Sequence, residues 1–208
     1  MDTTLDIINK HPELQKGFSW IMKNSTSNNL PYHNFNHLLT VVRYTYGACQ
    51  FYQLTEKEEK EMLMAALFHD VNHSGGDFRD DVNVQMAKET VTKFIEQFCD
   101  HIDSDEVCRI INATEYPYVI EPEDMDLKQQ IIRDADLMQI FEPNWIQQIM
   151  MGLCLEMGVT MDKMIPGQID FLMKAQFNTN WGIFWKENTW KEVRQKLVDL
   201  DKLYNLDI

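Results

Sequence analysis

Apolar side chains recur three and four residues apart along almost the whole chain, and this spacing constrains the fold more than any other feature. In the segment 32–54, for example, one helix face would carry Leu38, Val41, Val42, Thr45 and Ala48. The regular alternation of apolar and polar residues that marks a strand is absent from the sequence. We therefore expect an all-α fold, a compact helical bundle.

Local signals add helix boundaries to this pattern. Residues 5–22 form a first helical region that Pro12 loosens, and Thr55 with Glu58 forms a capping box that opens the helix carrying 62–71. The chain shows no internal repeat, low-complexity tract or linker, so we expect one domain over residues 1–208. Further helices are expected near 83–99, 104–115, 125–141, 144–157, 162–177 and 188–205.

The formal net charge of −14 at pH 7 limits the possible partners. It disfavours a nucleic-acid polymer, because phosphates bind to basic surfaces. A small anionic substrate meets the same repulsion unless divalent cations invert the local field. An acidic protein that acts on a phosphate therefore needs metal to dominate its site, and we expect a small-molecule nucleotide as substrate.

The sequence also bears on the compartment. No apolar run approaches the roughly 20 residues that span a membrane, and residues 1–4 lack the features of a secretory signal. The cysteines are far apart with no C-x-x-C pair, which indicates reduced thiols rather than a disulfide framework. We expect a cytoplasmic protein without a membrane partner, and the sequence does not predict its oligomeric state.

Four of the six histidines, His33, His37, His69 and His73, fall within 41 residues. His33 and His37 share a helix face if both are helical, and His69 and Asp70 lie about 100° apart around a helix, so that both can lean into one groove. In a helical bundle, ligands on facing helices converge in the core. Imidazoles and carboxylates without a thiolate fit a hydrolytic centre better than a structural zinc.

Asp70 is the strongest single indication of metal binding, because it lies in the apolar stretch 65–71. A buried carboxylate costs several kcal/mol unless it is paired or bound to metal. A lone histidine is more often a hydrogen-bonded core residue than a ligand, but the joint arrangement predicts a metal site. Two ions about 3.5–4 Å apart would share a water and lower its pKa toward about 7.

A fourth ligand is expected from a distant helix, and the segment 131–137 offers two candidates, Asp134 and Asp136. They are about 200° apart around a helix, so they cannot both face one site. One is a ligand, and the other pairs with Arg133 or with water. Spacing alone leaves the choice open.

These residues resemble the HD superfamily, whose ordered signature is H…HD…D. Here the signature is His37, His69-Asp70 and Asp136, and Asp136 is preferred because Ala135-Asp136-Leu137 matches the family's A-D-L. The superfamily covers phosphodiesterases, nucleotidases and triphosphohydrolases.

Finer matches resemble the catalytic domain of class I cyclic-nucleotide phosphodiesterases, in family order from residue 32 to about 190. Residues 32–37 (YHNFNH) match Y-H-N-x-x-H, and 69–75 (HDVNHSG) match H-D-x-x-H-P-G with Ser74 replacing proline. Residues 110–115 (IINATE) are similar to I-L-A-T-D. Residues 168–172 (QIDFL) are similar to Q-x-x-F-I, followed by an aromatic stretch.

The resemblance implies a metal-binding role for four residues. His37, His69, Asp70 and Asp136 would hold the tighter metal, usually zinc, with iron or manganese also suited to these ligands. Asp70 would bridge to a second metal, usually magnesium or manganese, that is otherwise held mostly by water.

Other matching residues would act on the substrate. His33 would be the general acid that protonates the departing 3′ oxygen, a task that suits a group with an ordinary pKa of about 6.5. His73 would assist catalysis by supporting the second metal, and Thr114 would contact the waters of that metal.

Tyr32, Gln168 and Phe171 would bind the nucleotide. By resemblance, Gln168 would hydrogen-bond the purine edge and Phe171 would stack on the ring. The sequence departs from the family after Leu137, where Met138-Gln139-Ile140 stands in place of S-N-P, whose asparagine helps to hold the base.

The leading interpretation is hydrolysis of a 3′,5′-cyclic nucleotide to the 5′-monophosphate. A nucleotidase or deoxynucleotide triphosphohydrolase is the alternative, but it would need basic residues for free phosphates, and the metal-flanking segments are poor in lysine and arginine. A third interpretation is a non-enzymatic helical domain with a relict metal site. In such a domain we would expect a metal ligand or the general acid to be lost, yet all the expected residues are present.

Overall fold

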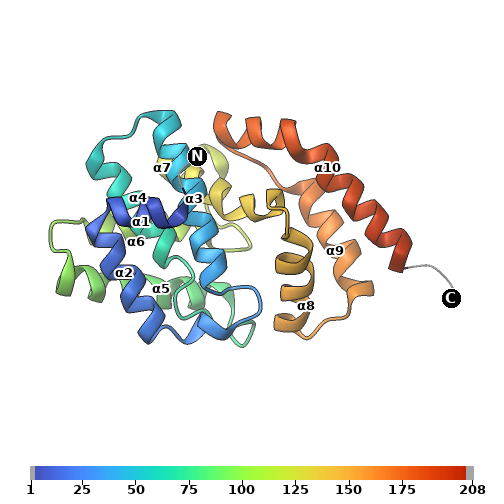
Figure 1. The fold of residues 1–208 in the computed structure, drawn as a ribbon, viewed down its shortest axis with the longest axis horizontal. Helices are drawn as coiled ribbons and strands as arrows, with labels where there is room; N and C mark the ends of the chain where they lie inside the picture. Colours follow the sequence, from blue (N-terminus) through green and yellow to red (C-terminus); the bar gives the residue numbers. More distant parts are fainter. Residues whose placement is uncertain (1–2, 205–208) are drawn as a thin grey trace.

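The computed structural model describes residues 3–204, and in that range it is helical without a strand, which confirms the all-α prediction (Figure 1). None of the described helices is long and apolar enough to cross a membrane. Short 3-10 turns cover 26–29, 112–114, 122–124 and 138–141, and a π-helical turn covers 146–151. The α-helices are α1 (Thr4–Lys10), α2 (Pro12–Asn24), α3 (Phe35–Tyr52), α4 (Glu56–Phe68), α5 (Asp80–Phe98), α6 (Ser104–Ile111), α7 (Leu127–Leu137), α8 (Gly152–Met157), α9 (Met161–Lys174) and α10 (Asn180–Tyr204).

Helix α4 is the centre of the bundle. Its residues from Met62 to Phe68 are all 0% exposed, so this half of the helix is surrounded by protein on every side. It packs against α2, α3 and α6. The predicted capping box opens it, because Thr55 Oγ1 accepts the Glu58 N–H and the Glu58 carboxylate accepts the Thr55 N–H. Figure 1 shows α8, α9 and α10 together at one side of the molecule, beyond α3.

Several predicted boundaries differ from the observed ones. Pro12 does not loosen one helix but begins a second, because proline lacks the N–H that a first-turn position leaves unpaired. Helix α4 ends at Phe68 rather than at Val71. Helix α10 begins at Asn180, earlier than the expected 188, and Asn205 at the end of that expected helix lies outside the described residues.

Asp134 fastens α7 to the beginning of α10. The side chain is 0% exposed, and its two oxygens accept hydrogen bonds of 2.7–3.0 Å from the backbone N–H and side-chain groups of Asn178 and Thr179. Burial raises the pKa of this carboxyl, and the four hydrogen bonds oppose that rise. Gly182 permits the approach, because a Cβ at that position would overlap the Asp134 carboxylate. Asp134 therefore has a structural role and does not pair with Arg133 as expected.

We predict that Asp134→Asn lowers the free energy of unfolding by about 2–4 kcal/mol, because the new amide N–H₂ would face donors and leave them unpaired. Denaturant-induced unfolding of the purified variant checks this. Asp100→Asn is the matched control, because Asp100 is 97% exposed and its loss should cost less than about 0.5 kcal/mol. Equal stability of the two variants would contradict the role given to Asp134.

Candidate metal centre and the cavity beside it

The structure brings His37, His69, Asp70 and Asp136 together, with one ligand atom from each lying within 4.8 Å of the others. His37 Nε2 lies 3.2 Å from Asp70 Oδ2 and 3.0 Å from Asp136 Oδ1. His69 Nε2 lies 3.2 Å and 3.5 Å from the same two oxygens. Ligands bound at about 2.1 Å and at right angles around one ion are about 3 Å apart. The spacing therefore fits a single divalent ion at the centre of the four groups.

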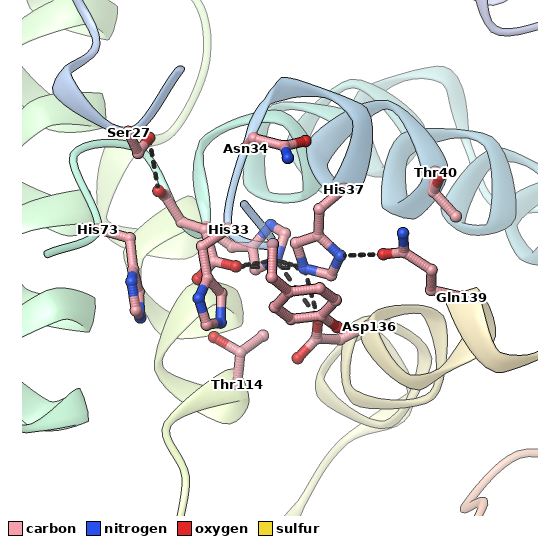
Figure 2. Close-up of polar contacts among 12 residues, drawn as sticks. Ser27, His33, Asn34, His37, Thr40, His73, Thr114, Asp136 and Gln139 are labelled. Carbon is pink, nitrogen blue, oxygen red and sulfur yellow. Dashed lines mark hydrogen bonds and ion pairs between the residues drawn. The ribbon is translucent and has the colours of Figure 1, made fainter. Parts of the chain in front are cut away.

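In each imidazole, Nδ1 points away from the cluster, and the hydrogen bond that it makes fixes which ring nitrogen carries the proton. His37 Nδ1–H donates to Gln139 Oε1 at 2.7 Å, and His69 Nδ1–H donates to the Ala66 carbonyl at 2.9 Å, as Figure 2 shows for His37. In the neutral rings, both Nε2 atoms then carry lone pairs and face each other at 3.2 Å. Two acceptors at that distance repel unless a proton or a metal ion lies between them. The donor set is thus arranged for a cation.

The pKa shifts of the four side chains also indicate a site for a cation. Burial opposes a charge on His37, but the carboxylates of Asp136 and Asp70 outweigh it and raise the pKa of His37 to about 9. The same two carboxylates raise the pKa of His69 well above its ordinary value against burial. Burial would raise the pKa of Asp70 and of Asp136, yet the two imidazoles hold both well below the usual range. The cluster is therefore short of positive charge, which a divalent ion would supply.

The local geometry of the ligands differs from the expected helical one. His69 is the C-cap of α4, and Asp70 lies in the turn that follows, so the two are not a helical pair. His33 precedes α3, which begins at Phe35, and does not share a helix face with His37. Asp136 is in the last turn of α7 and faces the cluster, whereas Asp134 faces α10. The geometry resolves the choice that spacing left open.

His33 and His73 lie beside the cluster in a second group of side chains. Their rings stack at 3.7 Å between centroids, and Figure 2 shows the pair next to Thr114. His33 Nδ1 pairs with the Glu156 carboxylate, which also accepts the backbone N–H groups of Tyr32 and His33 at 2.9 Å and 3.1 Å. Burial acts to raise the pKa of Glu156, but the bonds from His33 outweigh it and lower that pKa. Glu156 thus fixes both the position and the ring orientation of His33.

A cavity of about 310 Å³ opens next to the two groups. It contains every residue predicted to act on the substrate except His73: His33, Tyr32, Gln168, Phe171 and Thr114 all line it. The buried Thr114 hydroxyl donates to the Ile111 carbonyl at 2.9 Å. The remaining wall consists of Asp70, Asp80, Tyr116, Tyr118, Asp136, Leu137, Ile140, Ile149, Leu153 and Met157.

Two residues of the site were missed by the sequence reasoning. Glu156 is an acid in the apolar run 149–157, the same signal that singled out Asp70, and its side chain is only 2% exposed. Gln139 stands where the resembling family places a base-holding asparagine. Here it is buried, contacts His37 and donates from Nε2 to Gln148 Oε1 at 3.2 Å. Its amide therefore supports a candidate metal ligand and does not line the cavity.

Comparison with protein families gives a match to the part of the chain that carries the cluster. The family model described as HD domain matches residues 34–139, half of the chain. The matched range includes His37, His69, Asp70 and Asp136, and it excludes His33, Glu156 and Gln168. A search of curated proteins finds no match.

We predict that Gln139→Leu weakens metal binding about 10- to 100-fold, because the His37 Nδ1–H loses its acceptor and the ring loses its orientation. Titration of the metal-free protein with Zn²⁺ or Mn²⁺ against a competing chelator measures the affinity. Gln147→Leu is the matched control, because Gln147 is an exposed neighbour of Gln148. If both variants bind metal as tightly as the unmodified chain, Gln139 does not position His37.

Proposed function

The chain belongs to the HD-domain family of metal-dependent phosphohydrolases, and from that premise we propose that it hydrolyses a 3′,5′-cyclic nucleotide to the 5′-monophosphate. The observation that carries the proposal is the composition of the cavity beside the His/Asp cluster. Its wall combines the Asp70 and Asp136 carboxylates of the cluster with apolar side chains, Gln168 and Phe171. A ligand that fits places a phosphate at the cluster and a flat, largely apolar body against the rest of the wall.

The charge of the cavity favours a phosphodiester over a polyphosphate. Among the described residues, no lysine or arginine lines its wall, and three carboxylates, Asp70, Asp80 and Asp136, do. The cyclic diester carries one negative charge, whereas a triphosphate carries three or four and would need cationic side chains. This distinction supports the cyclic nucleotide over the triphosphohydrolase alternative.

His37, His69, Asp70 and Asp136 would hold the tighter ion, for which we propose zinc, with iron or manganese as substitutes. For a second ion, magnesium or manganese, Asp70 would supply the protein ligand. Divalent ions bound there polarise phosphoryl oxygens and lower the pKa of a water to about 7.

The chain's own residues supply the proton and hold the substrate. Glu156 accepts the Nδ1–H of His33, which leaves Nε2 as the atom that delivers a proton to the departing 3′ oxygen. His73 lies against the His33 ring and limits its rotation, while its own Nδ1 accepts the Gly75 N–H at 3.0 Å. We assign His73 to holding the acid in place, beside the support for a second ion that the resemblance implies.

The base would bind against Gln168 and Phe171 in the wall of the cavity. The Gln168 amide offers a donor and an acceptor to a purine edge, and Phe171 offers a face for stacking worth about 1–3 kcal/mol. Tyr32 also lines the cavity, and its ring centroid lies 5.0 Å from that of His37. Burial, with the nearby Asp136 and Asp70, raises the pKa of Tyr32 well above its ordinary value, so its hydroxyl stays protonated and can donate.

The decisive test offers cyclic AMP, cyclic GMP, nucleoside monophosphates and dNTPs side by side to the metal-loaded protein. We expect turnover of a cyclic nucleotide to the 5′-monophosphate and none of the dNTPs. The reaction should stop when a chelator removes metal and in Asp70→Ala, which removes a ligand of the cluster. Release of triphosphate or phosphate without cyclic-nucleotide turnover would contradict the proposal, as would full activity in Asp70→Ala.

A second prediction isolates the general acid. His33→Ala should lower kcat on the cyclic nucleotide by about 10²–10⁴-fold, because a sugar alkoxide departs poorly without a proton. The loss should be much smaller on a 4-nitrophenyl phosphodiester, whose leaving group needs no proton. Metal content, measured by elemental analysis, should stay unchanged. An equal loss on both substrates, or a loss of metal, would show that His33 has another role.

A further inference from the structure

A second cavity, of about 430 Å³, adjoins the catalytic one. The two cavities share three aromatic side chains, Tyr116, Tyr118 and Phe171, which line both. Tyr116 and Phe171 pack edge to face, with their ring centroids 5.5 Å apart. A ligand bound at the metal cluster therefore reaches the second cavity by passing these rings, and each cavity offers an aromatic surface to a base.

Arg133 lies in the wall of the second cavity and is only 2% exposed. Its Nε donates to the Ala113 carbonyl at 2.9 Å, and its Nη1 donates to the Ile120 carbonyl at 3.0 Å. The third nitrogen, Nη2, is buried and has no acceptor among the described residues. The Tyr118 ring covers the guanidinium, 4.0 Å from its central carbon. Burial lowers the pKa of Arg133.

An unpaired N–H on a buried guanidinium is costly, and an anion is the group that offsets the cost best. Nε and Nη1 each donate to a backbone carbonyl, which leaves Nη2 as the nitrogen available to a group that enters the cavity. Lys174 adds a second cation to the wall, where it pairs with Asp170 at 2.7 Å. Glu121 and Asp170 are the acids of this wall, so its cations equal its acids in number.

The two cavities differ in the charged side chains that line them. In the part of the chain that the structure describes, three aspartates and no lysine or arginine line the catalytic cavity, whereas Arg133 and Lys174 line the adjoining one. The binding of a phosphate at the cluster would depend on metal. A second phosphate of the same ligand, bound in the adjoining cavity, would instead contact cationic side chains. The anion that accompanies a nucleotide is a phosphate, which matches the planar fork of an arginine.

We propose that the cavity around Arg133 is a subsite for a second phosphate group, so that the substrate class extends to 3′,5′-linked nucleotides that carry two phosphates. Tyr118 shifts from the guanidinium to admit the phosphate, and Phe171 separates the two nucleotide units. This inference rests on the proposed function, since it places the first phosphate at the metal cluster. It adds Arg133 and Lys174 to the residues that determine specificity.

The kinetic test compares cyclic AMP with cyclic di-AMP, which share the adenine base and the 3′,5′ linkage and differ in the second nucleotide unit. The unmodified chain should have the higher kcat/KM on cyclic di-AMP. Lys174→Glu reverses a charge in the subsite wall. Arg133→Lys keeps the positive charge but removes the planar guanidinium and its paired N–H donors. Each should lower the ratio of kcat/KM for cyclic di-AMP to that for cyclic AMP by about tenfold or more.

Lys163→Glu is the matched control, because Lys163 is an exposed residue of the same helix α9 and lines neither cavity. It makes the same charge reversal and should leave the ratio as in the unmodified chain. Because Lys174 is 74% exposed, its variant should fold even if Arg133→Lys does not. A ratio that stays constant across Lys174→Glu and Lys163→Glu would overturn the subsite.

A binding test separates a second phosphate of the substrate from a free one. Inorganic phosphate should raise the Tm of the unmodified chain more than that of Arg133→Lys. If phosphate binds in this Arg133-dependent way but the kinetic ratio does not change, the cavity takes a free anion and the extension of the substrate class is wrong. If neither cyclic nucleotide is turned over, the proposed function fails, and the phosphate titration still decides whether the Arg133 cavity binds anions.

Discussion

The surrounding protein holds one ligand atom from each of two imidazoles and two carboxylates within 4.8 Å of one another, and the rest of the site depends on this constraint. Such an arrangement needs a rigid frame, because the ligand atoms would otherwise separate. The apolar segment Met62–Phe68 of α4 supplies that frame, since it is fully buried and ends directly before His69. Hydrogen bonds to the Ala66 carbonyl and to Gln139 then keep both imidazoles turned inward.

The site is built largely at helix ends, which explains both its chemistry and its geometry. His33 lies just before α3, Asp70 in the turn after α4, and Asp136 in the last turn of α7. Outside a helix, the backbone can turn a side chain in directions that a regular 100° step does not allow. The turn after α4 thus lets His69 and Asp70 face one point while His73 faces another, where it stacks on His33.

The sequence predicted that His37, His69, Asp70 and Asp136 lie together, as they do in the structure, but it did not predict the local geometry that brings them there. Apolar periodicity was sufficient for the all-α fold, and Thr55 with Glu58 was sufficient for the start of α4, because both signals are local. The helical pairing of His33 with His37 was wrong because a periodic pattern does not show where a helix begins. The pairing of Asp134 with Thr179 joins residues 45 apart in sequence, and that of Glu156 with His33 joins residues 123 apart. Contacts of such long range depend on the packing of the whole chain, which local patterns do not encode.

Net charge and site composition together explain how an acidic chain can act on a phosphate. With a net charge of −14 and three aspartates in the catalytic cavity, the protein repels an anion both at long range and on contact. Salt screens the distant charges beyond about 8 Å, but it screens the partly buried aspartates much less. Phosphate binding at the cluster would therefore depend on divalent metal, and the described residues of the cavity wall, which include no lysine or arginine, would make this dependence stricter. Under the proposed function, selectivity would follow from the same fact, because each phosphate beyond the first must be neutralised elsewhere, and the adjoining cavity wall carries the cationic side chains Arg133 and Lys174.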